Sequence, residues 1–332
     1  MTNNALLRVE HLKKYFPVRK GIFSSFASST KRSYVRAVDD ISFTLQEEEI
    51  LGFVGESGCG KSTMSRAILR LTEPTDGKVF FRDREIISLG KKAFKAYRAK
   101  MQMIFQDPFG SLNPRRTVAD TLYQTIKVHN LADSKPRVAS LIQKTLEEVE
   151  LKPADQFWDK FPALLSGGQL QRVSIGRVLV LQPSFVIADE SVSMLDVSVR
   201  IGILDLLERM RDKFGISFIY ITHDLVTARY ICDRIAIMYL GKIVEIGPTE
   251  EIVHNPRHPY TQALISAVPD PDPTAELPEL PIKGYVPMAL DEAFNGCKFY
   301  MRCPCSTNAC REQYPQMQEV GEGHQVSCFQ WD

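Results

Sequence analysis

The chain has 332 residues, of which 41 are Lys or Arg and 40 are Asp or Glu, and 44% of its residues are hydrophobic. This length allows a large core and more than one domain, and the balanced charge disfavours a protein that coats nucleic acid, which usually has a basic excess. No apolar run reaches the roughly 18 residues that span a bilayer, and the N-terminus lacks the basic and apolar segments of a secretory signal, so we expect a cytoplasmic protein.

Short apolar strands alternate with helices along most of the chain. Hydrophobic periodicity predicts helices at residues 61–73, 139–151 and 199–214, within a pattern that is mainly helical from about 107 to 182. A serine-rich, basic segment at residues 20–34 interrupts the pattern as an inserted loop. The predicted strands are residues 5–16, 36–45, 48–55, 78–86, 99–106, 184–190 and 215–223.

This alternation predicts an α/β fold with a helical subdomain inserted at about residues 107–180. From Pro256 onward prolines become dense and the periodicity ends. We therefore predict a main domain at residues 1–255 and a small, irregular module at residues 256–332. The chain has no internal repeat, so it holds a single unit of this kind.

The sequence GESGCGKST at residues 55–63 fits the phosphate-binding pattern Gly-x4-Gly-Lys-Ser/Thr. It lies between a predicted strand and a predicted helix, the context that confirms the pattern. Backbone N–H groups of such a loop surround a phosphate, the lysine adds a positive charge and the serine hydroxyl can bind Mg²⁺. The residues assigned to this ATP and Mg²⁺ site are Gly55, Ser57, Gly58, Cys59, Gly60, Lys61, Ser62 and Thr63. Cys59 fills a variable position of the loop.

Two carboxylates end the apolar strand FVIADE at residues 185–190. Asp189 is placed to hold Mg²⁺ through water, and Glu190 can then act as the general base for the attacking water. Gln106 and His223 also stand at strand ends, where the first can reach a metal or a water and the second a γ-phosphate.

The segment LLSGGQLQR at residues 164–172 opens a helix with one serine and two glycines. Such a start exposes backbone N–H groups that can bind an anion, although an ordinary helix cap has the same appearance. The residues concerned are Ser166, Gly167, Gly168 and Gln169.

Together these motifs resemble the ATPase subunits of ATP-binding cassette transporters over about residues 5–255. The resemblance implies a RecA-like core with an antiparallel β subdomain, and two subunits that sandwich each ATP head to tail between Lys61 of one and Ser166 and Gly168 of the other. It implies that Asp196, in SMLD, belongs to the dimer-contact loop and that Tyr15 stacks on adenine, with Phe16 as the alternative. This chain departs from the family at Ser191, where proline is usual, and at Met194, where alanine is usual.

Residues 255–269 and the segment after Gln106 resemble the oligopeptide and dipeptide import ATPases, and the insertion after the first strand is more like their F-type subunit. The tail contains that subfamily's pattern Gly-Cys-x-Phe-x-x-Arg-Cys once, at residues 296–303. Four thiolates suit an iron–sulfur cluster or a zinc ion, and the resemblance implies a [4Fe-4S] cluster. Its expected ligands are Cys297, Cys303, Cys310 and Cys328, with Cys305 as an extra thiol that leaves a C-x-C alternative open.

The resemblance implies an ATP-hydrolysing subunit that drives import of dipeptides or oligopeptides. Its implied partners are a second, D-type ATPase subunit, two transmembrane permeases and an extracytoplasmic binding protein, and the chain would lie at the cytoplasmic side of the cell membrane. Relatives also move nickel, opines, glutathione and oligosaccharides, which remain alternatives, and a soluble ATPase outside transport is a further one. Nucleotide binding is expected to be independent of the cysteine cluster, because the ATP motifs lie far upstream.

Overall fold

The computed structural model describes four stretches of the chain, and it divides them between two compact units. The inserted loop predicted at residues 20–34 lies almost wholly outside the described residues, and so does most of the proline-rich linker. Of the described residues, unit 1 holds 5–6, 45–50 and 88–221, and unit 2 holds 7–18, 34–44, 51–87, 222–268, 282–284 and 294–331. The described residues are 5–18, 34–268, 282–284 and 294–331.

Unit 1 is built on three parallel strands in the order β6, β7, β8. Every residue of β7 and of β8 is buried, which is the pattern of parallel strands covered on both faces. The strands are β6 (Met101–Ile104), β7 (Phe185–Asp189) and β8 (Ser217–Thr222).

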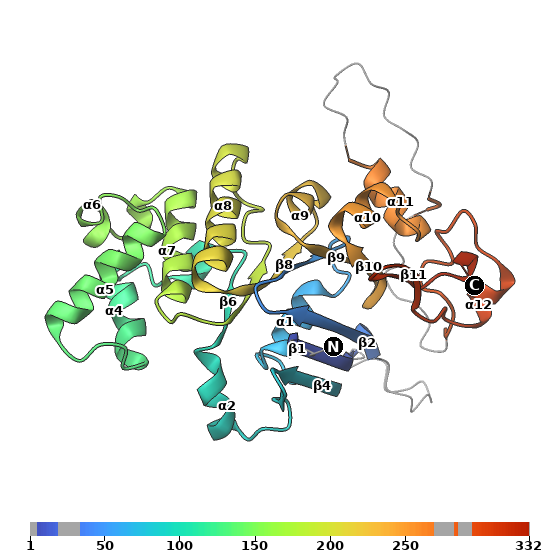
Figure 1. Cartoon of the computed structure of the whole chain (residues 1–332), viewed down its shortest axis with the longest axis horizontal. Coiled ribbons are helices and arrows are strands. Elements are labelled where there is room, and N and C mark those ends of the chain that lie inside the picture. The colour runs from blue at the N-terminus through green and yellow to red at the C-terminus, as the bar shows by residue number, and fades with distance from the viewer. Residues whose placement is uncertain (1–4, 19–33, 269–281, 285–293, 332) are drawn as a thin grey trace, which may run out of the picture. The chain divides into compact units, whose positions relative to one another are not determined.

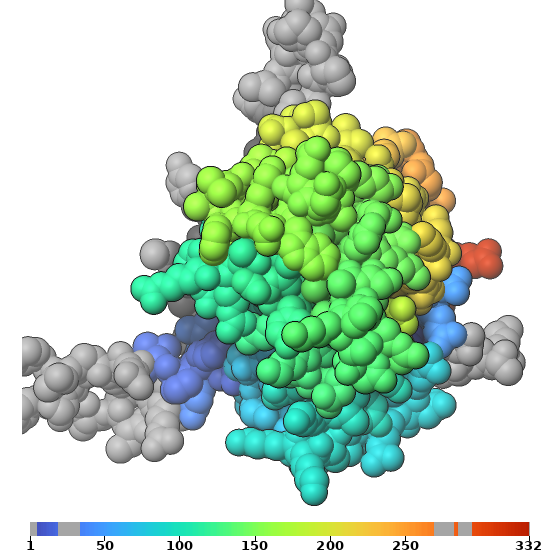
Figure 2. Space-filling view, turned by 90° about the vertical axis from the view of Figure 1, so that its left-hand side faces the viewer, coloured from blue at the N-terminus to red at the C-terminus, as the bar shows by residue number. Residues whose placement is uncertain are grey.

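The stretch between β6 and β7 is helical, as its periodicity predicts. Helices α4 to α7 gather beside one another in Figure 1, and Figure 2 shows the face of unit 1 that their side chains cover. The helices of unit 1 are α2 (Lys91–Arg98), α3 (Pro108–Ser111), α4 (Val118–Val128), α5 (Lys135–Glu148), α6 (Asp155–Trp158), the 3₁₀ turn η2 (Pro162–Leu164), α7 (Gly167–Leu179) and α8 (Val197–Phe214).

Unit 2 contains a sheet in the order β2, β1, β4, β5, in which β1 pairs with β4 and β4 with β5 in antiparallel fashion, as expected for the predicted antiparallel part. The first strand runs to Pro17, one residue beyond its predicted end, so Tyr15 lies within it. The strands are β1 (Ala5–Pro17), β2 (Tyr34–Gln46), β4 (Asp76–Phe81) and β5 (Arg84–Glu85).

A second set of strands in unit 2 has the order β11, β12, β10, β9, β3, in which β3 and β9 are parallel and the others antiparallel. Helix α1 ends earlier than predicted because Arg70 adopts a left-handed conformation, with φ 49°, and the Leu71 N–H closes on the Arg66 carbonyl at 2.8 Å, a helix-ending turn. The elements are β3 (Ile50–Val54), β9 (Arg234–Tyr239), β10 (Lys242–Pro248), β11 (Gln318–Gly321), β12 (His324–Val326), α1 (Lys61–Ile68), α9 (Leu225–Ile231), α10 (Thr249–His254), α11 (Pro259–Ser266), α12 (Asn308–Glu312) and η3 (Phe329–Trp331).

The tail beyond residue 256 is less irregular than its composition predicts. Its strand β12 pairs with β10, and Figure 1 shows this part, in red, beside β10. The buried Glu245 of β10 accepts hydrogen bonds from His324 Nε2 at 2.7 Å and from the backbone N–H groups of Arg257 at 2.7 Å and His258 at 2.9 Å. One carboxylate therefore holds both the beginning and the end of the tail.

Candidate functional site

The predicted phosphate-binding loop connects β3 to α1 in unit 2. Lys61 is 4% exposed, and its Nζ donates to the carbonyls of Gly55 at 2.6 Å and Glu56 at 3.1 Å. The loop is thus wrapped around the lysine ammonium, which is the charge that a phosphate group would meet. Ser62 and Thr63 follow in the first turn of α1 and are half-buried.

Gly60 is required by the backbone of this loop. It precedes α1 with φ 109°, and a Cβ at this position would lie 2.1 Å from the Ala37 carbonyl oxygen. Ser57 and Gly58 are exposed, whereas Cys59 is buried with its Sγ 3.7 Å from Lys61 Nζ. Burial raises the pKa of the Cys59 thiol, so the side chain fills space as a neutral group.

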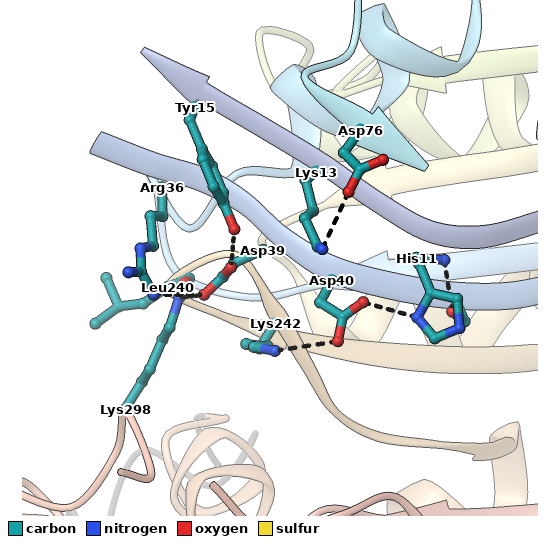
Figure 3. A network of polar contacts seen from close by, with 11 residues as sticks. His11, Lys13, Tyr15, Arg36, Asp39, Asp40, Asp76, Leu240, Lys242 and Lys298 are labelled. Carbon is teal, nitrogen blue, oxygen red and sulfur yellow. Dashed lines mark hydrogen bonds and ion pairs between the residues drawn. The ribbon is translucent and has the colours of Figure 1, made fainter. Parts of the chain in front are cut away.

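Tyr15, the predicted adenine-stacking residue, is held by a polar network (Figure 3). Its hydroxyl donates to Asp39 Oδ1 at 2.6 Å, and Lys298 Nζ lies 2.9 Å from Asp39 Oδ2. Burial and the bond to Asp39 raise the pKa of Tyr15 well above its usual range. Burial alone would raise the pKa of Asp39, but Lys298 outweighs it and keeps the carboxyl ionised. Phe16, the alternative stacking residue, is 40% exposed.

The predicted carboxylate pair follows β7 in unit 1. Asp189 is buried, while Glu190 has φ 45°, a left-handed conformation that is uncommon outside glycine and that clusters at functional sites. Gln106 Nε2 donates to Glu190 Oε2 at 3.0 Å. The structure therefore brings two of the predicted catalytic residues into direct contact.

The segment at Ser166 forms a complete capping box at the start of α7. The Gln169 N–H donates to Ser166 Oγ at 3.3 Å and the Ser166 N–H to Gln169 Oε1 at 3.1 Å, while Gly167 is half-buried and Gly168 buried. These are the bonds of an ordinary cap, and the serine hydroxyl remains at the surface.

Asp196 caps the start of α8, also in unit 1. Its carboxylate accepts hydrogen bonds from the Val199 N–H at 3.0 Å and the Ser198 hydroxyl at 2.9 Å, and these bonds lower its pKa. The neighbouring Met194 and Val197 are 64% and 70% exposed. His223 belongs to unit 2, where it is exposed just before α9.

The tail encloses a cavity of about 520 Å³ whose lining includes every cysteine of that tail. Burial raises the pKa of Cys297 to about 12 and of Cys303 to about 11, and it raises that of Cys328. Cys305 is exposed. Within the described residues, no group of three or more His, Cys, Asp or Glu side chains is arranged to hold a metal ion, so the metal site stays a prediction.

Backbone N–H groups point at three of these sulfurs. Cys297, Cys303 and Cys328 each accept a hydrogen bond from the residue two positions further along the chain. Cys310 Sγ lies 3.4 Å from the Thr307 hydroxyl, and the Cys310 carbonyl accepts the Cys297 N–H at 2.7 Å. The last contact needs Gly296, because a Cβ there would lie 2.6 Å from that carbonyl oxygen.

Sequence reasoning missed four charged residues around the loop and Tyr15. Asp39 stands beside Tyr15 and is paired with Lys298 from the tail. Glu56 stands beside Lys61 and is paired with Arg302 from the tail. In the sequence, Arg302 stands out only as the arginine of the pattern Gly-Cys-x-Phe-x-x-Arg-Cys. No local signal pairs it with a residue so far upstream.

Two family descriptions match the chain. Residues 38–193 match the ABC transporter family, and residues 244–310 match the oligopeptide/dipeptide transporter C-terminal region. A probable peptide ABC transporter ATP-binding protein of Sinorhizobium fredii is 42% identical over 98% of this chain and 90% of its own length. The oligopeptide transport ATP-binding protein AppF of Bacillus subtilis is 40% identical over 97% of this chain and 96% of its own length.

Solved structures agree with these sequence matches. A dimeric ATP-binding cassette in a post-hydrolysis state, bound to ADP and phosphate, is 26% identical and superimposes with a TM-score of 0.62 over 73% of this chain and 98% of its own. The chain therefore belongs to the ABC transporter family, as an ATPase subunit that carries the C-terminal region of oligopeptide and dipeptide transporters.

Proposed function

We propose that this chain hydrolyses ATP to energise the import of dipeptides or oligopeptides through a membrane transporter. The observation that carries the proposal is the full-length similarity to peptide transport ATP-binding proteins, which includes the C-terminal region and not only the cassette. The substrate itself would be bound by other subunits.

The ATP site would be assembled from the motifs described above. Lys61 and the backbone of its loop would hold the phosphates, and Ser62, Gln106 and Asp189 would hold Mg²⁺. Glu190 would accept the proton of the attacking water, which agrees with its direct contact to Gln106. The remaining assignments are His223 at the γ-phosphate, Tyr15 at adenine, and Ser166, Gly167, Gly168 and Gln169 of a second subunit at the phosphates.

The second subunit would be a D-type ATPase that meets the loop containing Asp196. The exposed Met194 and Val197 support a contact there, because they present apolar surface next to the polar cap. Two permeases would dock on the helical part of unit 1, which exposes apolar side chains at Phe109, Tyr123, Phe161 and Leu164.

The chain would associate with the membrane through those permeases and would lie at its cytoplasmic side. The extracytoplasmic binding protein would lie at the opposite side of the membrane. Among the helices of the described ranges, none combines the length and the apolar character that a membrane crossing requires.

We further propose that residues 256–332 form a cluster-bearing extension of the cassette at residues 1–255. The cavity of about 520 Å³ is lined by the cysteines of the tail, and four thiolates suit a [4Fe-4S] cluster, with a zinc ion as the alternative. The ligands would be Cys297, Cys303, Cys310 and Cys328. Hydrogen bonds to cluster sulfurs are a common means of tuning such sites, and three of these cysteines accept one. When bound, the cluster would supply cross-links to a tail that has little core of its own.

A reconstituted transporter tests the function. The chain, its partner ATPase and the permeases in lipid vesicles should hydrolyse ATP faster when a peptide-loaded binding protein is added. Lys61→Ala should weaken ATP binding, whereas Lys92→Ala, which alters an exposed lysine of α2, should not. Stimulation by nickel or by an oligosaccharide, with none by peptide, would reassign the substrate and leave the ATPase standing.

A further inference from the structure

The segment of residues 297–303, which we name the cysteine turn, is compact and internally bonded. The Tyr300 N–H donates to the Cys297 carbonyl, and the N–H groups of Arg302 and Cys303 both donate to the Phe299 carbonyl, each at 2.9 Å. This geometry fixes the direction in which the two cations of the turn, Lys298 and Arg302, extend.

Arg302 reaches the phosphate-binding loop of the same unit. Its two terminal nitrogens bind the two carboxylate oxygens of Glu56 at 2.9 and 3.0 Å, the bidentate geometry that gives the strongest side-chain pairs. The arginine side chain is 6% exposed and that of Glu56 is 29% exposed. Glu56 is itself part of the loop, since its carbonyl accepts the bond from Lys61 and its N–H donates to the Tyr260 hydroxyl at 3.0 Å.

Lys298 contacts Asp39, the residue that binds the Tyr15 hydroxyl, in a similar way. Its Nζ pairs with Asp39 at 2.9 Å and donates to the Leu240 carbonyl at 2.7 Å, as Figure 3 shows. The lysine and aspartate side chains are 12% and 9% exposed. Asp39 in turn accepts the Tyr15 hydroxyl, so the lysine holds the tyrosine through one intervening carboxylate.

Between the two cations, Phe299 anchors the cysteine turn in the core of unit 2. Its ring packs edge-on against Tyr239, with centroids 5.2 Å apart, and lies 5.4 Å from the Tyr260 ring. Tyr260 is the same residue that accepts the Glu56 N–H. The turn therefore meets the loop through an ion pair and through a packed aromatic group.

We propose that Lys298 and Arg302 are positioning residues for ATP, and that they act by neutralising and orienting Asp39 and Glu56 at the nucleotide cradle. The inference rests on the proposed ATP site. Glu56 belongs to the loop that would receive the phosphates, so its carboxylate repels them unless Arg302 balances its charge. Binding of the nucleotide and order in the cysteine turn are then coupled in both directions.

The test measures the equilibrium affinity of the purified full-length chain for ATP and for a fluorescent ATP analogue. Arg302→Ala should weaken binding about tenfold, within the usual range of coupling between sites. Arg302→Lys, which keeps the charge and loses the paired geometry, should fall between. Arg311→Ala serves as the control, because this arginine of the same tail is exposed.

The double variant Glu56→Ala with Arg302→Ala separates positioning from a purely structural role. Removal of the repelling carboxylate should restore most of the affinity that Arg302→Ala loses, whereas lost packing would not be restored. Lys298→Met should raise KM for ATP in the assembled transporter and leave kcat near its wild-type level, the sign of lost binding.

The outcomes distinguish this inference from the function on which it rests. Wild-type affinity in Arg302→Ala, or equal loss in the single and double variants, would overturn the positioning role while ATP binding stands. Absence of ATP binding by the unaltered chain would instead remove the proposed site. If Arg302→Ala does not fold, Arg302→Lys and the double variant decide in the same way.

Discussion

At the scale of single residues, Glu190 is held by contacts of its backbone and of its carboxylate. Its left-handed backbone costs free energy, of order 1–3 kcal/mol for such conformations, and the Glu190 N–H bonds the Ile221 carbonyl at 2.9 Å. Gln106 fixes the carboxylate at 3.0 Å. A general base gains from such fixed geometry, because it need not reorganise when the water attacks the phosphate.

Glu190→Gln should therefore keep ATP binding and lose turnover by about 10²-fold or more, since a positioned base contributes 10²–10⁴ in rate. Glutamine has the same shape and can still contact Gln106, but it cannot take a proton. Steady-state hydrolysis in the assembled transporter, with Glu208→Gln of α8 as the matched control, measures the effect. Hydrolysis near the wild-type rate in Glu190→Gln would exclude this residue as the base.

Residues of local motifs can be singled out from the sequence, whereas residues of long-range pairs cannot. Lys61 and Asp189 stand in patterns whose spacing is set by one loop or one strand, so each pattern can be read without the fold. Arg302 and Glu56 are 246 positions apart, and their pairing depends on how the chain folds back. The contacts of Lys298 with Asp39 and of Arg302 with Glu56 are of this long-range kind, and the independence of nucleotide binding from the cluster stays a prediction.

At the scale of elements, α11 begins with an unusual cap. His258 is buried, and its Nδ1 accepts the Tyr260 N–H at 3.0 Å. Burial lowers the pKa of His258 to about 4, against the opposing effect of Glu245. The ring is therefore neutral, as it must be to accept that bond.

This cap should make stability depend on pH. In the unfolded chain His258 is protonated below the ordinary pKa of 6.5, whereas in the folded chain it stays neutral down to about pH 4. The free energy of unfolding therefore falls as the pH falls across this window. The loss is on the order of 3 kcal/mol at its limit. Urea unfolding between pH 7 and 4.5 measures it, and His258→Asn, a cap that does not titrate, should flatten the curve. The same slope in both proteins would contradict the assignment.

The cysteine cavity gives a second prediction at this scale. Anaerobically purified protein should be brown and contain about four irons per chain, and Ser in place of Cys297, Cys303, Cys310 or Cys328 should lose the metal. Cys305→Ser should retain it, because Cys305 is exposed. Iron and zinc analysis with visible absorbance reads out the result. Colourless protein with one tightly held zinc would show that the site binds zinc and not an iron–sulfur cluster. Loss of the metal only in Cys305→Ser would show that Cys305 is a ligand.

Elements were predictable where they carry a periodic pattern. The strand β7 and the helix α8 are apolar and long enough to be recognised, and both appear near their expected bounds. Strand β12 has only three residues, which is too short for any periodicity, and it exists because β10 offers a partner. Its presence could not be read from the tail alone.

At the scale of the whole molecule, one chain does not supply a complete proposed site. Ser166 and Gly168 are assigned to the nucleotide of another subunit, so the isolated chain should hydrolyse ATP slowly, and the rate per chain should rise when the partner ATPase and permeases are added. Hydrolysis assays on fractions of verified mass measure this. Rapid turnover by a monomer would remove the head-to-tail arrangement.

The pairing of β12 with β10 has a consequence for the tendency of the protein to aggregate. Strand β10 is buried almost throughout, and an apolar strand with an open side recruits strands from other molecules. The tail closes that side with β12, and β11 beyond it is short and bears Glu319, the kind of outer strand that resists such recruitment. A chain cut at residue 255 would expose β10, and we expect it to aggregate, as judged by light scattering, even with every ATP motif intact.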